Sequence, residues 1–516
     1  PYTRGEDSGQ NQWTWQHYNA AVGYDGTFGR HVVSASAGIL YNIYKTDFSQ
    51  NGAAGKMVEY RHMTVNGAVN YAYDDRYVAT FSFAADGSDN YRPGNRWGFY
   101  PSLGLGWIVS RERFLRDSRT VDLLKLRASV GKNGWDPMGE MRYLWEGYYT
   151  GRGGLNTGNS EHTWHGGTAL SYLPNPGIFA EKSLKYDAGI DLRLWNRLSL
   201  NVDLFLEKRS GIVTQDWMIP GASGVDNPPY RNIGRMTNKG FEVQLSWADR
   251  IGDFNYALTG MASYNSNKVD YMAEVVTVPT AARTGRRLDA LFGYVADGFY
   301  DWDDFDVGGE LREGLPKPTF GAVQPGDIKY KNLNGDTVID ENDQTAIGDS
   351  YLPKLQYSFS LAASYKGFDL FALFQGAAGR DVNLLDAPLQ NIAFRDNGNV
   401  YGIAEGRWAY YPEQGIDTRA TATYPRLSLQ DNSNNYRNST LWKRSGDFLK
   451  LRNVELGYTF AQPSLSKAGI SKIRIYLSGV NLLTVSKLMR DYDIDPEILS
   501  GHPALKSYNL GLTVTF

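Results

Sequence analysis

Hydrophobic and polar residues alternate with a period of two along most of the chain. From residue 198, the apolar side chains of Leu198, Leu200, Val202, Leu204 and Leu206 are separated by mostly polar neighbours. The same alternation occurs in residues 33–43, 188–194, 241–247 and 508–516. Because successive side chains of a β-strand point to opposite faces of its sheet, each segment is predicted to be a strand with one apolar and one polar face.

Helical periodicity is weak by comparison, and its best example is residues 111–124. Counting the alternating segments and the breaks between them gives about 15 strands, the first near residues 13–24 and the last ending at Phe516. The chain is therefore predicted to be all-β.

The connections between the predicted strands are of two lengths. Short connections are expected at residues 74–75, 196, 249–252, 366–367 and 463–471, and long ones near 134–182, 211–235, 270–352, 379–441 and 486–506. From residue 183 onward the two kinds alternate. Outer-membrane barrels have short periplasmic turns at one end and long external loops at the other. The pattern therefore predicts a transmembrane antiparallel β-barrel with its long loops outside the cell.

The strand directions predict that this barrel is not complete within the sequence. With an odd strand number the first and last strands would both run toward the periplasm, whereas bacterial barrels close with an even number of antiparallel strands. An open sheet edge in lipid would leave unpaired backbone groups, each costing several kcal/mol. We therefore expect residues 1–516 to be the C-terminal part of a longer barrel, and the absence of Met before Pro1 agrees with this expectation.

Composition and motifs exclude several classes of function. The chain has no cysteine, which excludes disulfides, cysteine-bound metals and thiol catalysis. Its formal net charge of -3 gives no reason to expect nucleic-acid binding. The metalloprotease, nucleophile-elbow and phosphate-loop motifs do not occur in the sequence, so we expect no enzymatic activity. No run approaches the roughly 18 apolar residues of a membrane helix, but barrel strands escape this criterion because they alternate.

Several blocks of the sequence resemble the SusC-like (SusC/RagA) TonB-dependent transporters of Bacteroidetes outer membranes. They include VDLLKLRASVGKNGWD at 121–136, IGRMTNKGFEVQLSW at 233–247, FGYVADGFY at 292–300 and SYNLGLTVTF at 507–516, together with residues 70–115, 175–208 and 325–379. These blocks follow the order of the family over nearly the whole chain.

The resemblance implies a barrel of about 22 strands, with the plug domain and the TonB-contacting segment outside this sequence. It implies import of large nutrients, such as glycan or peptide fragments, across the outer membrane. The implied partners are a SusD-like lipoprotein over the external loops, the TonB complex as energy source, the outer-membrane assembly machinery and the lipid membrane. A dimer of transporter–lipoprotein pairs is also implied.

Aromatic residues are concentrated in the long connections, where flat rings with polar edges can stack on sugar faces or on peptide side chains. The residues predicted to contact substrate or lipoprotein are Trp135, Trp145, Trp164, Trp217, Tyr230, Trp408 and Tyr410, from a wider set that includes Trp302 and Tyr411. Alternatively, these rings pack one loop against another or lie at the membrane interface.

Residues 332–343 have the spacing of a loop that wraps Ca²⁺ with oxygen ligands. The candidate ligands are Asn332, Asn334, Asp336, Asp340 and Asp343, with the backbone carbonyl of Val338. Two positions depart from the pattern, because Asn332 replaces the first Asp and Thr337 replaces the turn-forming Gly. The alternative is a turn stabilised by its Asn and Asp side chains without any metal.

Phe516, at the end of an alternating strand, looks like the signal read by the outer-membrane assembly machinery. Three other functions stay open at this point. A siderophore or cobalamin receptor would need no lipoprotein lid. A secreted all-β glycoside hydrolase or carbohydrate-binding protein would be soluble without detergent. A passive porin would not need an external loop as long as residues 270–352.

Overall fold

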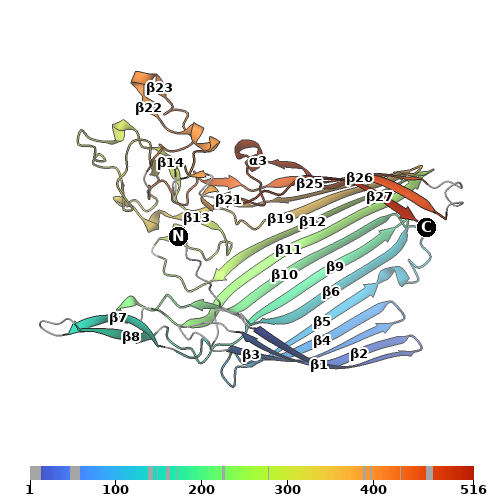
Figure 1. Ribbon diagram of the computed structural model, residues 1–516. Coiled ribbons are helices and arrows are strands. Elements are labelled where there is room, and N and C mark those ends of the chain that lie inside the picture. Colours follow the sequence, from blue (N-terminus) through green and yellow to red (C-terminus); the bar gives the residue numbers. More distant parts are fainter. Residues whose placement is uncertain are drawn as a thin grey trace, which may run out of the picture. The chain divides into compact units, whose positions relative to one another are not determined.

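A computed structural model describes residues 13–46, 58–136, 143–147, 149–157, 163–170, 172–223, 227–276, 278–386, 391–394, 398–429, 432–460 and 469–516 (Figure 1). Almost all of its regular structure is β, as the alternation predicted. Within these residues no helix has the length and apolar character required to cross a membrane.

Fifteen strands form the main sheet, and their order in the sheet follows their order in the chain. They are β1 (Trp13–Phe28), β2 (His31–Thr46), β3 (Val58–Tyr73), β4 (Tyr77–Ser88), β5 (Trp97–Ile108), β6 (Val121–Trp135), β9 (Glu181–Leu194), β10 (Leu198–Gln215), β11 (Tyr230–Ile251), β12 (Phe254–Tyr271), β19 (Leu355–Tyr365), β20 (Phe368–Ala378), β25 (Phe448–Phe460), β26 (Lys472–Ser486) and β27 (Ser507–Thr515). The pairings from β1 to β6 and from β12 to β27 are antiparallel.

Short turns lie where Asp, Asn and Gly interrupt the alternation. Asp74 and Asp75 have φ of 54° and 53° between β3 and β4, and Asn196 has φ of 51° between β9 and β10. Positive φ at both central residues is typical of the two-residue hairpins whose twist matches that of the flanking strands. The predicted turn at 249–252 is displaced, since β11 continues to Ile251 and the chain turns at Gly252. Of the predicted turn 463–471, residues 463–468 lie outside the described residues.

The weak helical periodicity at residues 111–124 does not correspond to a helix. Only a single 3-10 turn, η1 (Val109–Arg111), precedes a non-helical segment, and β6 already begins at Val121. The apolar residues near 123 occupy exposed and half-buried positions of strand β6. So short a run of apolar residues fits the helical period of 3.6 as well as the strand period of two. Conversely, the helix α3 (Lys487–Tyr492) lies in a segment expected to be loop, and the Ser486 hydroxyl caps it by accepting a 2.9 Å hydrogen bond from the Met489 amide.

The long connections contain small elements of their own. The strands are β7 (Tyr149–Thr157), β8 (Thr163–Leu170), β13 (Leu291–Gly293), β14 (Ala296–Phe299), β15 (Lys317–Pro318), β16 (Ile328–Tyr330), β17 (Val338–Ile339), β18 (Thr345–Gly348), β21 (Asp381–Asn383), β22 (Tyr410–Tyr411), β23 (Ile416–Asp417) and β24 (Lys443–Ser445). The 3-10 turns are η2 (Gly221–Ser223), η3 (Pro279–Ala281), η4 (Trp302–Asp304), η5 (Glu341–Asp343), η6 (Leu384–Asp386), η8 (Gly402–Gly406) and η9 (Pro412–Gln414).

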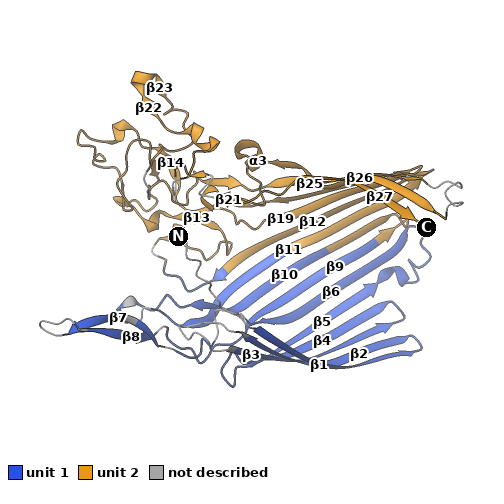
Figure 2. Ribbon diagram, viewed as in Figure 1, with its two compact units in different colours: residues 1–192, 203–239, 270–275 blue, residues 193–202, 240–269, 276–516 orange. Residues whose placement is uncertain are grey.

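The chain divides into two compact units, coloured separately in Figure 2. The first comprises residues 1–192, 203–239 and 270–275, and a small core around Tyr91, Leu144 and Ile178 lies in its loops. The second comprises residues 193–202, 240–269 and 276–516. Its larger core includes Ile328, Ile339 and Trp442, so the long loops of this unit fold into a packed body.

The two faces of the strands differ as a membrane wall requires. In the first unit, the paired residues Phe81 and Leu103 on β4 and β5 expose their apolar side chains, whereas Ser82 and Ser102 on the opposite face join their hydroxyls at 2.7 Å. Soluble monomers rarely expose apolar patches of this extent, while the outward face of an outer-membrane wall is apolar. A total of about 22 strands, closure of the wall and the location of a plug stay predictions.

Candidate functional site

A pocket of about 550 Å³ lies in the loops of the second unit. Its side chains come from residues 302–309, 323–325, 408–411 and 426–427, which belong to two of the predicted long connections. The volume is in the range of ligand sites, about 300–1,000 Å³. We call this the loop pocket, and it brings the predicted residues Trp408 and Tyr410 together.

The first wall of the loop pocket is held by a capped turn. The Asp301 carboxylate accepts a 2.8 Å hydrogen bond from the Trp302 amide, and the Asp304 carboxylate accepts a 3.0 Å bond from the Asp301 amide. This reciprocal capping fixes η4 and leaves the Trp302 side chain 57% exposed. Behind it, Tyr300 and Phe305 pack edge to face in a small buried cluster, and burial raises the pKa of the Tyr300 phenol to about 12.

The second wall carries two consecutive tyrosines. Tyr410 and Tyr411 form β22, which pairs with β23, and Gly415 with φ of 67° allows the turn between them. The Arg419 guanidinium lies 3.9 Å from the centre of the Tyr410 ring and is held by Asp417, whose pKa is lowered by the hydrogen bonds from Arg419. One face of Tyr410 is therefore covered by a cation, while Tyr411 is 53% exposed.

A buried carboxylate joins the segments that line the loop pocket. Asp327 is fully buried, and its Oδ1 accepts hydrogen bonds from Arg426 Nε at 2.7 Å and from the amides of Asn432 and Asn435 at 2.9 Å each. Its Oδ2 accepts from the Gln324 backbone at 2.8 Å. Because buried charge is tolerated only when it is well paired, Asp327 holds the segment of Gln324 against the segment of Arg426, and both residues line the loop pocket.

The arrangement is suited to binding rather than to chemistry. The exposed rings of Trp302 and Tyr411 offer apolar faces, and Asp306, Gln324 and Arg426 lie among the lining residues as polar groups. Such a surface can stack against a sugar ring or an apolar peptide side chain while polar groups at its edge take hydrogen bonds.

The other predicted aromatic residues lie in the first unit. Trp145 and Tyr230 pack against the buried cluster of Tyr91, Leu144 and Ile178, which is the alternative role proposed for these rings. Trp135 at the end of β6, Trp164 on β8 and Trp217 after β10 are each more than half exposed. Contact of these five residues with substrate or lipoprotein stays a prediction.

The candidate calcium loop is held by hydrogen bonds of its own. The Asn332 and Asn334 side-chain oxygens and Asp336 Oδ1 accept from backbone amides of the same loop at 2.6, 3.1 and 2.9 Å. The Asp340 carboxylate caps η5, and the buried Asp343 accepts from two backbone amides at 2.7 and 2.9 Å. In the part of the chain that is described, no group of three or more His, Asp and Glu side chains has the geometry to hold a metal. Calcium binding stays a prediction.

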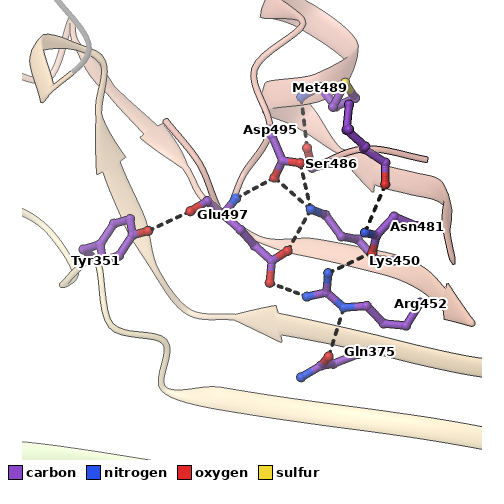
Figure 3. Close-up of polar contacts among 10 residues, drawn as sticks. Tyr351, Gln375, Lys450, Arg452, Asn481, Ser486, Met489, Asp495 and Glu497 are labelled. Carbon is purple, nitrogen blue, oxygen red and sulfur yellow. Dashed lines mark hydrogen bonds and ion pairs between the residues drawn. The ribbon is translucent and has the colours of Figure 1, made fainter. Parts of the chain in front are cut away.

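A buried ion cluster attaches the segment after α3 to β25 (Figure 3). Lys450 is 1% exposed, and its ammonium group donates to both oxygens of Asp495 at 2.8 and 2.9 Å and to Glu497 at 2.7 Å. Arg452 completes the set by pairing with Glu497 and donating to Gln375 at 3.0 Å. We call Lys450, Arg452, Asp495 and Glu497 the Lys450 cluster.

Phe516, the predicted assembly signal, follows β27 with its side chain exposed.

Several residues of the site were missed from the sequence. Asp327, Arg426 and Arg419 carried no motif, because the partners of Asp327 are about 100 residues away and local spacing does not report such contacts. The one local signal in the sequence is the asparagine-rich run Asn432-Ser433-Asn434-Asn435. In the structure the side chains of its three asparagines are buried, which is unusual for polar residues.

Comparison with known proteins agrees with this fold. The family described as TonB dependent receptor-like, beta-barrel matches residues 2–482. TonB-dependent receptor P3 of Formosa agariphila is 26% identical over 96% of this chain and 51% of its own length. TonB-dependent receptor SusC of Bacteroides thetaiotaomicron is 26% identical over 87% of this chain and 43% of its own length. The chain thus spans about half the length of the curated relatives it matches.

Among solved structures, the RagAB peptide transporter superposes with a TM-score of 0.72 at 21% identity, covering 98% of this chain and 56% of the other. This likeness concerns the fold. The family match and the SusC relative confirm the resemblance to SusC-like TonB-dependent transporters and the outer-membrane location. The chain belongs to the TonB-dependent receptor-like β-barrel family.

Proposed function

We propose that the transporter containing this chain imports large nutrients, such as glycan or peptide fragments, across the outer membrane with energy from the TonB complex. The observation that carries the proposal is the loop pocket, in which exposed aromatic rings and polar groups converge on the long loops of a TonB-dependent receptor barrel. Two solved relatives of the same fold are a peptide transporter and a peptide importer by title, RagAB in both cases, which supports a large substrate.

The partner we propose is a SusD-like surface lipoprotein that covers the long loops. In support, the loops of the second unit form a packed body with its own core, which offers a lipoprotein a preformed surface. Two transporter–lipoprotein pairs would then associate as a dimer. A siderophore or cobalamin receptor would need neither the lipoprotein nor the dimer.

Uptake by pocket variants tests the role of the loop pocket. Cells that express the complete transporter would be given single glycans or peptides as carbon source, with and without TonB. Trp302→Ala and Tyr411→Ala should raise the concentration for half-maximal uptake about 2- to 10-fold, the effect of losing one stacking ring. Trp97→Ala removes an equally exposed indole at the start of β5 and should leave uptake unchanged.

The outcomes are separable. Uptake that needs TonB but ignores both pocket variants would remove the loop pocket from the proposal. Uptake only of iron chelates or cobalamin would show that the substrate is a siderophore or cobalamin and not a glycan or peptide fragment. Affinity purification of the transporter from its own outer membrane should also recover a lipoprotein in equal amount, and the mass of the complex should equal two pairs; recovery of the transporter alone would contradict the partnership.

A further inference from the structure

A second concave site lies on the apolar face of the sheet in the first unit. It is a groove of about 510 Å³ over β3, β4, β5 and β6, and apolar atoms line almost all of it. It lies on a strand wall, and no part of it belongs to the loops described above. Its volume is again that of a ligand site rather than of a surface irregularity.

Small side chains make this groove. In the register of the sheet, Tyr71 is opposite Ala79, Ala79 is opposite Leu105, and Leu105 is opposite Ala128. These four residues therefore form one row across four strands, in which Ala79 and Ala128 leave the hollow. The rows on either side are bulky, with Tyr77, Trp107 and Leu126 on one side and Phe81 on the other.

The groove is on the outward face of the wall. Tyr77, Leu105 and Leu126 are all exposed there, whereas on the opposite face the Arg127 guanidinium donates to Asp191 at 3.3 Å and to Asp203 at 2.6 Å. Charged side chains paired in this way belong to the water-filled interior of a barrel, and the apolar alternate positions face lipid. The groove is therefore open to the hydrocarbon of the membrane.

One end of the groove is rigid and lies at the membrane interface. The Tyr77 hydroxyl and Trp107 Nε1 donate hydrogen bonds to Glu112 at 2.6 and 3.1 Å, and Arg76 donates to the same carboxylate at 3.1 Å. Tyrosine and tryptophan with the polar edge toward water mark the interfacial belts of membrane proteins. Because the short Asp74-Asp75 turn adjoins this end, it is the periplasmic end, and the groove opens to the inner leaflet.

The segment that follows the groove is positively charged. Residues 109–119 contain Arg111, Arg113, Arg116 and Arg119 against Glu112 and Asp117. Glu112 pairs with Arg76, while Arg111 lies 3.7 Å from Asp75 and Arg116 lies 3.8 Å from Asp117, in ion pairs that are exposed and therefore weak. All four arginines are exposed, and Phe114 beside them is 72% exposed. Exposed arginines next to an exposed aromatic ring suit the phosphate level of a bilayer, where basic clusters bind anionic head groups.

We propose that the groove binds one anionic phospholipid of the inner leaflet, with an acyl chain against Ala79 and Ala128 and its phosphate on the arginines of residues 111–119. The apolar row supplies the contact with the chain, and the arginines supply preference for a negative head group. The rings of Tyr77 and Trp107, fixed by Glu112, separate the two parts.

Native mass spectrometry of the complete transporter tests this site. The protein would be incubated in detergent with equal amounts of phosphatidylglycerol and phosphatidylethanolamine that carry identical acyl chains. The expected result is preferential retention of phosphatidylglycerol. The double variant Arg113→Gln/Arg119→Gln should reduce this preference about 5-fold for each arginine, with retention of phosphatidylethanolamine unchanged.

Filling the groove tests the chain-binding part. Ala79→Leu and Ala128→Leu should each lower retention of both lipids, because the added side chain occupies the hollow. Ala85→Leu is the matched control, since Ala85 lies on the same face of β4 and pairs with Phe99 outside the groove. Unheated electrophoretic mobility would verify that each variant is folded, and both substitutions of the double arginine variant lie in an exposed segment outside the strands.

Three results would overturn the proposal. Equal retention of the two lipids by the unmodified protein would remove the head-group site. Equal loss of lipid from Ala79→Leu and Ala85→Leu would remove the groove. Retention of lipopolysaccharide in place of phospholipid would contradict the assignment to the inner leaflet. None of these results bears on nutrient uptake, which is measured separately.

Discussion

Gly326 permits a close approach between two segments that form the loop pocket. Its φ is +89°, and a Cβ at this position would lie 2.6 Å from Cε3 of Trp408 and 2.8 Å from Cβ of Arg426. The Gly326 carbonyl also accepts a 2.8 Å hydrogen bond from the Arg426 amide. Glycine is therefore required twice, once for the backbone conformation and once for the space that the indole occupies.

Replacing Gly326 with Ala should loosen the loop pocket. We expect the free energy of local opening, measured by hydrogen exchange at the Arg426 amide, to fall by about 1–3 kcal/mol from overpacking against Trp408. Gly335→Ala separates the two causes, because Gly335 has a similar φ of +78° and nothing within 4 Å of its Cβ position. Similar exchange in the two variants would mean that the contact with Trp408 is unimportant.

At this scale the sequence predicted the kinds of residue better than their positions. Trp408 and Tyr410 were predicted to face a ligand because aromatic residues are frequent in the long connections, and they do line one pocket. Trp145 and Tyr230 satisfied the same criterion and pack against a buried cluster. What distinguishes the two pairs is a set of contacts between distant segments, such as Asp327 with Asn432, which no local pattern encodes.

The segment between α3 and β27 depends on the Lys450 cluster (Figure 3). Replacing Lys450 with Met would leave the buried Asp495 carboxylate without its cation, and losing one partner of such a pair costs about 3–5 kcal/mol. We therefore expect limited proteolysis to cut residues 493–506 much faster in Lys450→Met. Arg490→Gln is the control, since its pair with Asp491 is largely exposed, and it should leave cleavage unchanged. A resistant Lys450→Met protein would show that other contacts hold the segment.

The loop Asn332 to Asp343 allows a second prediction at the scale of an element. With Asn332 in place of Asp and Thr337 in place of Gly, we expect weak Ca²⁺ binding, with Kd of about 10⁻⁴–10⁻³ M as in extracellular modules. Titration calorimetry should lose the heat in Asp336→Asn, whose amide oxygen can still accept the Val338 hydrogen bond. Asp297→Asn, outside the loop, should retain it. Absence of heat in the unmodified protein at 10 mM Ca²⁺, roughly ten times the weakest of these values, would mean that the loop is a turn that binds no metal.

Elements were predicted well wherever one local period sufficed. Strands alternate over ten or more residues, and turns such as Asp74-Asp75 adopt the positive φ that Asp tolerates, so both could be read from neighbouring residues. The weak helical periodicity at 111–124 is not a helix, because its apolar residues are shared between an irregular segment and the start of β6. The helix α3 is only six residues long, and its Ser486 cap is the only local sign of it.

On the scale of the whole molecule, the outward face of the sheet is explained only by lipid. In the second unit, Leu510 and Leu512 of β27 are exposed, while Arg474 on the other face pairs with Asp369 and Glu455. In water, these apolar side chains would need a second layer of protein to cover them. In a membrane the lipid covers them, so no second layer is required. The alternation therefore predicted the environment of the protein as well as its secondary structure.

Phe516 offers a test of how such a wall is assembled. Its side chain is 85% exposed after the last strand, so its deletion should change the unfolding midpoint in detergent very little. If the assembly machinery reads this residue, deletion should nevertheless lower the amount of folded protein in the outer membrane several-fold. Leu510→Ala is the matched control, because Leu510 is similarly exposed on the same strand and should have no such effect. Equal yields from the two variants would show that Phe516 acts only as one more apolar residue facing lipid.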